Sequence, residues 1–486
     1  MNKPLRRMAV VASLMLFALL INANVRQVVT ADDYRDKPYN RRTLLAEYSR
    51  PRGPILVGDR EIAFSRETKR GDLKFQRVYA DGPVYAPVTG YISPAFGATA
   101  IERSENSFLN GTADEFFVRR VLDLLTNNRR RAGSVRLSID DQAQQAAYQG
   151  LVDTGRKGAV VAIDPRTGAI LAMASVPSFD PNKLASNNID EATRAKKQLE
   201  ADPDQPLDNR AILHRYPPGS VFKVVTAAAA LSNGYTPDTE VPGPAALDLP
   251  QTDRVLPNYD GRPCGPDNRT TLLNALRISC NTAFGAIGLD LGADKLKATA
   301  ERFGLNQDLD FPMQEATSIF PEDADPPQTA LSAIGQFDVA ITPLQAAMIA
   351  AGVANGGVVM QPYLVQEVRG PDLTPVFTAE PKPMPNQPAI SPEVASALTS
   401  MMVDVVENGT GQNAQIPGIP VAGKTGTAQH GPGTRPHAWF VSFAPANDPQ
   451  IAVAVVVESG LDDPSDISGG RLAAPIAKSV MEAYLR

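Results

Sequence analysis

The stretch GAVVAIDPRTGAILAMA, residues 158–174, contains two apolar runs, 159–163 and 169–174, separated by a turn with Pro and Gly. Apolar runs of this length bounded by turn residues predict a buried β-hairpin. A second hairpin is predicted near the carboxyl end, where residues 437–444 and 451–457 flank another Pro-containing turn.

Helical segments lie between the two hairpins in the sequence, among them residues 221–231 and 343–354. Strands at both ends of a domain with helices between them indicate one antiparallel sheet flanked by helices, which is an α+β fold. The chain has 486 residues, more than one hydrophobic core usually supports, so we expect more than one domain. We expect the α+β domain to cover residues 156–486.

Residues 26–155 differ in composition from the α+β domain. They begin with a charged and polar stretch and continue, from Arg52-Gly53-Pro54-Ile55 onward, as short β-like runs that turn residues interrupt. Such runs predict a small β-rich amino-terminal domain.

The amino terminus predicts a membrane segment. Residues 8–25 carry no ionisable side chain and follow three basic residues. The uncharged stretch approaches the roughly 20 residues that a spanning helix needs, so we expect residues 1–25 to be a cytoplasmic tail and signal-anchor. A cleaved signal peptide is an alternative, since Ile21-Asn22-Ala23 resembles a weak cleavage site, and a buried soluble helix is another. In both membrane interpretations the rest of the chain is exported.

The composition argues against two classes of function. Lys and Arg number 47 against 53 Asp and Glu, and a net charge of −6 argues against nucleic acid as the main partner. Three histidines and two cysteines offer too few ligands for a typical zinc site, so we expect no metal and no cofactor.

The two cysteines, Cys264 and Cys280, would be exported with the rest of the chain. Because that compartment can be oxidising, we predict a disulfide between them. Two small buried thiols are the alternative.

The segment Pro217-Pro218-Gly219 forms a rigid turn that leads to Ser220 at or near the start of an apolar helix. Lys223, three residues later, lies on the same helix face. A serine hydroxyl needs a base to become a nucleophile, and a desolvated lysine beside another cation can serve as one. Alone, the pattern is better explained by a capping serine followed by a solvated lysine.

Two downstream motifs complement Ser220 and Lys223. Ser279-Cys280-Asn281 offers a hydroxyl that can relay a proton and an amide that can hold a peptide carbonyl. Lys424-Thr425-Gly426-Thr427 has the composition of an edge strand and offers a cation, hydroxyls and a glycine that leaves room for substrate.

The order Ser-x-x-Lys, Ser-x-Asn, Lys-Thr-Gly resembles the penicillin-recognising serine transpeptidases and the serine β-lactamases. Further segments resemble class B penicillin-binding proteins: Arg52-Gly53-Pro54-Ile55, Asn209-Arg210-Ala211, Ile341-Thr342-Pro343-Leu344-Gln345 and His437-Ala438-Trp439-Phe440. The short spacing between anchor and α+β domain is similar to that of the actinobacterial division-associated members. It implies a dimerisation or pedestal-like amino-terminal domain, and we expect no glycosyltransferase domain.

The resemblance implies a role for each residue of the first two motifs. Ser220 attacks the carbonyl between the terminal D-alanines of a peptidoglycan stem peptide, with Lys223 as the base. Ser279 passes a proton toward the leaving D-alanine. Asn281 binds the donor peptide's amide or helps to hold Lys223.

The third motif binds substrate by the same resemblance. Lys424, Thr425 and Thr427 bind the terminal carboxylate of a stem peptide or a β-lactam, and Gly426 leaves room for it. The backbone N–H groups of Ser220 and Thr427 form an oxyanion hole. Because Cys280 occupies the middle of Ser-x-Asn, we hypothesise that the disulfide positions Ser279 and Asn281.

The implied activity is an acyl-serine D,D-transpeptidase of the cell membrane, with its catalytic domain outside the cytoplasm and β-lactams as acylating inhibitors. The implied partners are a polytopic glycan polymerase of the SEDS type and division proteins. Three alternatives remain: a serine β-lactamase, a D,D-carboxypeptidase, and a non-catalytic sensor or scaffold that binds β-lactams or muropeptides.

Two other polar sites are less favoured. His214 lies near Ser220 in sequence but has no evident acid partner, so we expect a surface or packing role. We expect His437 and Trp439 to belong to a strand.

Overall fold

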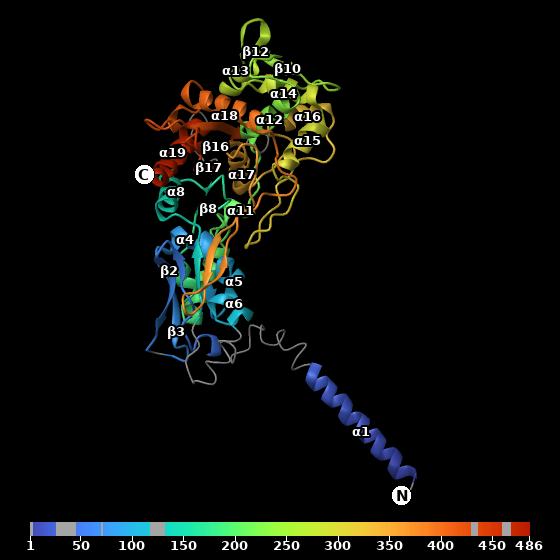
Figure 1. The fold of residues 1–486 in the computed structure, drawn as a ribbon, viewed down its shortest axis with the longest axis vertical. Coiled ribbons are helices and arrows are strands. Elements are labelled where there is room, and N and C mark those ends of the chain that lie inside the picture. Colours follow the sequence, from blue (N-terminus) through green and yellow to red (C-terminus); the bar gives the residue numbers. More distant parts are fainter. Residues whose placement is uncertain (1–2, 26–44, 70, 117–131, 429–435, 459–467) are drawn as a thin grey trace.

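The computed structural model describes residues 3–25, 45–69, 71–116, 132–428, 436–458 and 468–486. Figure 1 shows a separate apolar helix, a smaller β-rich part, and a larger part in which helices surround a central sheet. The expected α+β architecture, with a small β-rich amino-terminal part and a candidate anchor helix, is confirmed.

Five antiparallel strands form the centre of the larger part, in the order β15-β16-β17-β7-β8. Their bounds are β7 (Gly158–Ile163), β8 (Ile170–Val176), β15 (Ala422–Ala428), β16 (His437–Ala444) and β17 (Ile451–Val457). Both predicted hairpins are present as β7–β8 and β16–β17, and the pairing of β17 with β7 joins them. The edge strand β15 carries the Lys-Thr-Gly motif.

The helices of this part surround the sheet (Figure 1). They are α8 (Asp141–Asp153), α11 (Arg210–Leu213), α12 (Lys223–Ser232), α13 (Leu272–Arg277), α14 (Asn281–Leu291), α15 (Ala293–Arg302), α16 (Pro326–Ser332), α17 (Pro343–Ala354), α18 (Pro392–Glu407) and α19 (Ala474–Leu485). Helices α9 (Pro181–Leu184) and α10 (Ile189–Glu200) pack on each other, and α9 also contacts the smaller part. Short strand pairs β9 (Glu240–Pro242) with β12 (Arg269–Thr271), and β10 (Ala246–Asp248) with β11 (Val255–Pro257), lie beyond α14.

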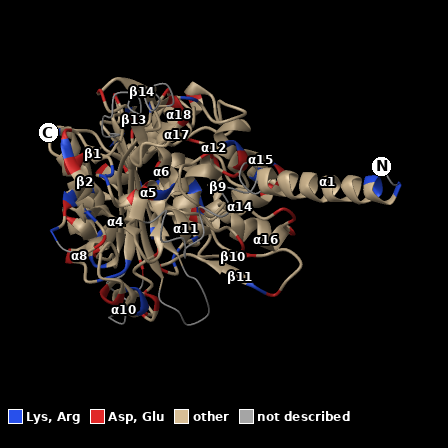
Figure 2. Cartoon of the chain, turned by 90° about the horizontal axis from the view of Figure 1, so that it is seen from below, with Lys and Arg blue, Asp and Glu red and all other residues tan. Residues whose placement is uncertain are grey.

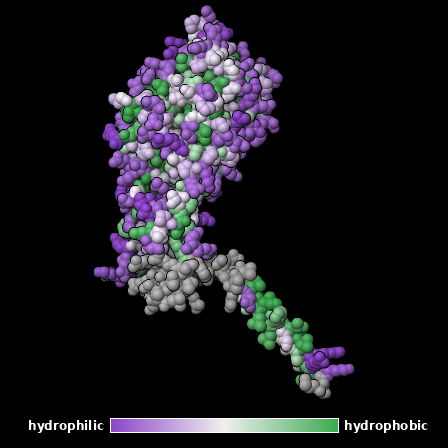
Figure 3. Space-filling model, in the orientation of Figure 1, coloured by the Kyte–Doolittle hydropathy of each residue, from purple (hydrophilic) through white to green (hydrophobic). Residues whose placement is uncertain are grey.

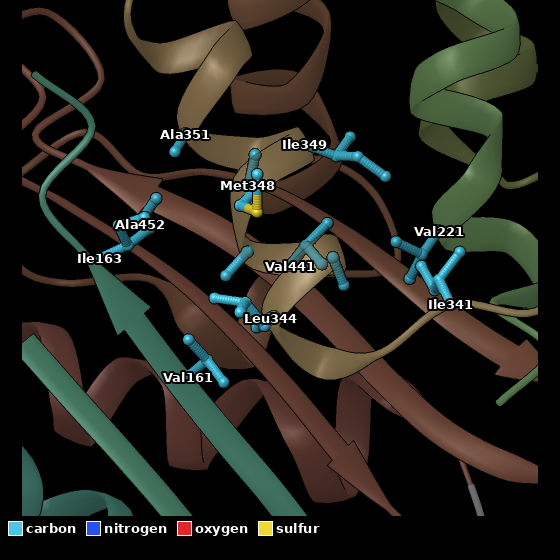
Figure 4. Close-up of a cluster of buried hydrophobic side chains, with 14 of the residues drawn as sticks. Val161, Ile163, Val221, Ile341, Leu344, Met348, Ile349, Ala351, Val441 and Ala452 are labelled. Atoms are coloured by element: carbon cyan, nitrogen blue, oxygen red, sulfur yellow. The ribbon is translucent and has the colours of Figure 1, made fainter. Parts of the chain in front are cut away.

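Both faces of the five-stranded sheet are buried. Val161 of β7 points to the face on which Leu344 and Met348 of α17 pack (Figure 4). Its neighbour Val160 belongs to a second apolar cluster, formed with α8 and α19 on the opposite face. Successive side chains of a strand point to opposite faces, which explains why these strands are continuously apolar.

The smaller part is built on a six-stranded sheet, in the order β14-β13-β6-β1-β2-β3. Its strands are β1 (Ile55–Val57), β2 (Arg60–Glu67), β3 (Phe75–Tyr79), β6 (Ser134–Leu137), β13 (Val365–Arg369) and β14 (Pro375–Thr378), with α4 (Gly82–Thr89), α5 (Ala100–Ser104), α6 (Asn106–Leu109) and the short pair β4 (Ile92–Ser93) and β5 (Gly97–Ala98) beside them. Strands β13 and β14 come from much later in the chain, and Val365 lies opposite Leu137.

A buried ionic cluster holds the smaller part together. The carboxylate of Glu102 is fully buried and accepts hydrogen bonds of 2.6 Å from the guanidinium groups of both Arg52 and Arg77. Tyr79 donates a third bond of 3.1 Å. Burial alone raises the pKa of Glu102, but Arg77 and Arg52 outweigh burial and lower the pKa below its ordinary value. The cluster thus keeps Glu102 charged and fixes Arg52 against the sheet.

Helix α1 (Lys3–Asn24) has no buried residue and is long and apolar enough to cross a membrane. Figure 3 shows its apolar surface, and the blue colour in Figure 2 marks basic residues at its amino-terminal end. The interpretation as a buried soluble helix is therefore wrong.

Candidate active site

Ser220 lies in a short 3-10 turn (Gly219–Phe222) that precedes α12. It is the second residue of this turn, two positions after the cap residue Pro218. Gly219 has φ +53°, and a Cβ there would lie 2.9 Å from the carbonyl oxygen of Thr427 and 2.9 Å from Cβ of Ala428. A glycine is required at this point because the turn carrying Ser220 packs directly on β15.

Strand β16 contacts the turn that carries Ser220 and stabilises it. The indole Nε1 of Trp439, which is fully buried, donates a 3.1 Å hydrogen bond to the carbonyl of Pro217. The ring of Tyr216 packs edge-on against Trp439, and its hydroxyl donates a 2.8 Å bond to Glu458. Arg210 also bonds Glu458, at 3.1 Å. Trp439 lies within a strand as expected and supports the turn that carries Ser220.

Lys223 is fully buried, and its amine faces the Ser-Cys-Asn segment. Its Nζ donates 2.7 Å hydrogen bonds to the carbonyl oxygen of Ser279 and to Oδ1 of Asn281, and lies 3.3 Å from Oγ of Ser279. Within the described residues, no hydrogen bond joins Nζ of Lys223 to Oγ of Ser220. Burial lowers the pKa of Lys223 well below its usual value, and the nearby Lys424 lowers it further. Burial and Lys424 therefore both favour the neutral form of this amine.

Lys424 approaches Ser279 from β15. Its fully buried Nζ donates 2.9 Å hydrogen bonds to Oγ of Ser279 and to the carbonyl oxygen of Thr425. Burial lowers the pKa of Lys424 to about 7. Ser279 itself has φ +64°, a conformation that non-glycine residues rarely adopt and that is common at functional sites.

The rest of the Lys-Thr-Gly strand faces the nucleophile turn. A Cβ on Gly426 would lie 2.7 Å from Cγ2 of Val221 and 2.9 Å from Cβ of Trp439, so no side chain fits there. The hydroxyl of Thr425 shares a 2.6 Å hydrogen bond with the hydroxyl of Thr410. No sequence pattern marked Thr410 as part of the site.

The Ser-Cys-Asn segment is fixed from two sides. A disulfide joins Cys280 to Cys264. The side chain of Asn258 accepts hydrogen bonds from the backbone N–H groups of Asn281 and Thr282, at 3.0 and 3.1 Å. Sequence reasoning missed Asn258 because it belongs to no motif and reaches the segment only through the fold.

The other candidate side chains do not join the site. Nε2 of His214 lies 2.9 Å from a carboxylate oxygen of Asp208, so the acid partner that the sequence did not reveal exists. Neither side chain hydrogen-bonds to Ser220 within the described residues. His437 begins β16. Across the part of the chain that the structure describes, no three His, Cys, Asp or Glu side chains are grouped to hold a metal ion.

Two family models match this chain. The model of the penicillin binding protein transpeptidase domain matches residues 158–482. The model of the penicillin binding protein A dimerisation domain matches residues 52–135.

Known proteins are similar to the chain over nearly its whole length. It is 46% identical over 493 aligned residues to the peptidoglycan D,D-transpeptidase PbpA of Mycolicibacterium smegmatis, covering 100% of this chain and 99% of the relative. Its fold is similar to that of penicillin-binding protein A from M. tuberculosis in a ceftriaxone acyl-enzyme complex, with a TM-score of 0.88, 45% identity, and coverage of 91% of this chain and 100% of the other. The penicillin G acyl-enzyme complex of that protein gives a TM-score of 0.86 at 44% identity, with coverage of 90% and 100%.

Proposed function

The chain belongs to the class B penicillin-binding proteins and is a peptidoglycan D,D-transpeptidase, and we propose that Ser220 is its nucleophile and Lys223 its general base. The observation that carries this assignment is the environment of Lys223, a fully buried amine held by two carbonyl oxygens one helical turn from Ser220.

Those two oxygens orient the base. A neutral lysine amine has two N–H bonds and one lone pair. The carbonyl of Ser279 and Oδ1 of Asn281, each at 2.7 Å, accept the two N–H bonds. The lone pair is then available to take the proton of Ser220 while Oγ bonds to the carbonyl carbon of the penultimate D-alanine.

Ser279 completes the proton transfer in this proposal. Because Nζ of Lys424 donates to Oγ of Ser279, the hydroxyl hydrogen of Ser279 is directed elsewhere. It passes to the amide nitrogen of the terminal D-alanine as the C–N bond breaks, and the proton held by Lys223 replaces it across 3.3 Å. The products of this step are free D-alanine and an ester on Ser220, which the amine of a second stem peptide then attacks.

In this proposal, residues of strand β15 bind the substrate. Lys424, Thr425 and Thr427 bind the terminal carboxylate of the stem peptide, beside Gly426, whose missing side chain lets β15 pack closely on Val221 and Trp439. The N–H groups of Ser220 and Thr427 form the oxyanion hole, where each donor contributes roughly 3–4 kcal/mol in other acyl-transfer enzymes. A β-lactam enters the same cleft and acylates Ser220.

The comparisons support the transpeptidase over the alternatives. The relative at 46% identity is named a peptidoglycan D,D-transpeptidase, and the similar structures are β-lactam acyl-enzyme complexes. Neither supports a β-lactamase, a carboxypeptidase or a non-catalytic sensor.

We further propose three domains: a cytoplasmic tail and signal-anchor (1–25), a non-catalytic domain of the dimerisation or pedestal kind (26–155) and the transpeptidase domain (156–486). The unburied apolar helix α1 and its basic end favour a single-pass protein with the transpeptidase domain outside the cytoplasm. A disulfide at the active site suits that compartment. A SEDS-type glycan polymerase and division proteins are the proposed partners, because a chain that only cross-links needs another enzyme to supply glycan strands.

The test uses the full-length chain in detergent, with a fluorescent penicillin and a D-Ala-D-Ala stem-peptide substrate. Wild type should become labelled, release D-alanine, and transfer the acyl group to an added D-amino acid. Ser220→Ala should do none of these, and labelling that persists in Ser220→Ala would end the assignment. Labelling without D-alanine release would identify a sensor, and release without transfer a carboxypeptidase.

A further inference from the structure

Helix α14 begins with an unusual cap. The first N–H groups of any helix lack partners within the helix, and Ser, Thr, Asp or Asn usually supplies an oxygen for them. Here the cap position is Cys280, whose sulfur is already in the disulfide and accepts only a 3.3 Å contact from the N–H of Ala283. Sulfur is a weak acceptor, so the amino terminus of α14 needs another partner.

Asn258, which directly follows β11, supplies that partner. Its Oδ1 accepts both the N–H of Asn281 (3.0 Å) and the N–H of Thr282 (3.1 Å). Its Nδ2 donates to the carbonyl oxygens of Pro244 (2.9 Å) and Arg262 (2.7 Å). The residue is 7% exposed, and both hydrogens and both lone pairs of the amide are used. Asn258 therefore caps α14 from a distant segment and ties that segment to it.

The same segment also sets the orientation of the side-chain amide of Asn281. Nδ2 of Asn281 donates a 3.1 Å hydrogen bond to the carbonyl of Pro257, the residue before Asn258. Its Oδ1 consequently faces Nζ of Lys223 at 2.7 Å. If the amide were reversed, its NH₂ group would face Lys223 and compete for the lone pair that must take the proton of Ser220.

We propose that Asn258 is a positioning residue for acylation: it holds the backbone of Asn281 and the neighbouring carbonyl of Pro257 so that the oxygen of Asn281 orients the amine of Lys223. The inference rests on the proposed role of Lys223 as the base.

The groups around Lys223 determine how loss of the Asn258 cap would change the pKa of Lys223. The charged side chain that faces Lys223 within the described residues is Lys424 of β15, and the ring of Phe284 in α14 lies 5.6 Å from Nζ. Loss of the Asn258 cap thus introduces no new charge. It loosens the amide that holds the amine and admits water beside it, which favours the protonated form of Lys223.

The experiment measures the rate constant for acylation of the full-length chain by a fluorescent penicillin as a function of pH. Asn258→Ala should lower the highest rate about tenfold to a hundredfold, because a misplaced base slows proton transfer. The limb on which the rate rises with pH should also move to higher pH. Asn258→Asp keeps an oxygen that accepts the two N–H groups but loses the two bonds that Nδ2 donates to Pro244 and Arg262, so its highest rate should fall less than that of Asn258→Ala.

Asn182→Ala is the matched control. Asn182 is a partly buried asparagine that hydrogen-bonds the backbone N–H and carbonyl of Tyr79 and the side chain of Asp180, away from the site. It should lower the melting temperature but leave the acylation profile unchanged. If Asn258→Ala does not fold, Asn258→Ser, whose short side chain cannot reach both N–H groups, takes its place.

A wild-type rate and pH profile in the alanine or serine variant would overturn the proposal, as would an equal loss in Asn258→Asp or in Asn182→Ala. These outcomes differ from a failure of the proposed function, which would appear as unlabelled wild type or labelled Ser220→Ala.

Discussion

The amine of Lys424 donates a 2.9 Å hydrogen bond to Oγ of Ser279, although the two residues lie 145 positions apart in the chain. The same oxygen lies 3.3 Å from the amine of Lys223. Two buried amines therefore converge on one hydroxyl. Burial lowers the pKa of both amines. The positive charge of Lys424 lowers the pKa of Lys223 further.

The acylation rate should depend on pH in a bell shape. It rises as Lys223 loses its proton and falls above pH about 7, where Lys424 loses the charge that binds a carboxylate. Lys424→Arg keeps its charge, so its falling limb should move up by about two pH units or more. Rapid mixing with a fluorescent penicillin between about pH 5 and about pH 10 measures both limbs. An unmoved falling limb in Lys424→Arg would show that Lys424 is not the group responsible.

The free energy of unfolding should also depend on pH because the pKa of Lys424 is lowered. Between pH about 7 and its ordinary pKa near 10.5, Lys424 is neutral when folded and protonated when unfolded. The unfolded state then binds more protons, so the free energy of unfolding rises with pH, by roughly 1.4 kcal/mol per unit from this group. Lys424→Met has no titrating group at this position, so it lacks this pH-dependent contribution to the free energy of unfolding. Its melting temperature should exceed that of wild type most at pH 7 and below, and the difference should shrink as the pH rises. A difference independent of pH would contradict the lowered pKa.

The disulfide should contribute to both stability and rate. It closes a loop with a sequence separation of 16, worth about 3 kcal/mol in the chain-entropy model. Cys264→Ser combined with Cys280→Ser should lower the melting temperature and slow acylation, because Cys280 lies between Ser279 and Asn281. Reduction should slow wild type but not the double variant. Unchanged acylation after complete reduction would leave the disulfide with a stabilising role alone.

Gly426→Ala should separate β15 from the nucleophile turn. The added Cβ would meet Val221 and Trp439 at distances under 3 Å, so the strand or the turn must move. A displacement near 1 Å costs on the order of a hundredfold in rate, which we expect for acylation. Gly418→Ala, at an exposed position with nothing within 4 Å, is the control for a glycine substitution far from the cleft, although its φ of +78° makes it costly in stability. Equal acylation in both variants would contradict the packing argument.

Glu102→Gln should destabilise the smaller part without changing catalysis. It removes the carboxylate that pairs with the buried Arg77 and leaves Arg52 its 3.3 Å contact with Glu47, and breaking a buried ion pair from one side typically costs about 3–5 kcal/mol. Asp81→Asn, which breaks the exposed contact with Arg60, should cost no more than about 1 kcal/mol. Thermal unfolding compares the two variants, and penicillin labelling at low temperature should match wild type in both. Slower labelling in folded Glu102→Gln would reveal coupling between this cluster and the active site.

The elements that could be predicted from the sequence are those whose signal is local. The hairpins β7–β8 and β16–β17 follow from continuous apolar runs with a turn between them. The three motifs could be recognised because each contains its chemistry within a few residues. The fold brings Lys223, Ser279 and Lys424 within hydrogen-bond reach.

What the sequence could not reveal depends on distant pairing. Nothing in residues 365–378 indicates that they extend a sheet whose other strands lie before residue 138. The cap of α14 is likewise hidden, because strand β12, helix α13 and the loop closed by the disulfide lie between Asn258 and Asn281 in the sequence. The lowered pKa of Lys223 follows from burial, which a four-residue motif does not determine.

The placement of β13 and β14 in the amino-terminal sheet limits how the molecule can bend. Within residues 132–428, the chain passes between the two sheets after Leu137, before Val365 and after Thr378, and the segment after β8 also contacts β3 through Asn182. Two bodies joined by one connection can swivel about a hinge, whereas three adjacent connections remove that rotation and leave only small sliding movements. The three crossings lead to α8, α17 and α18, which all pack on the five-stranded sheet. A force applied to the smaller part would therefore reach the five-stranded sheet with little rotation between the two parts.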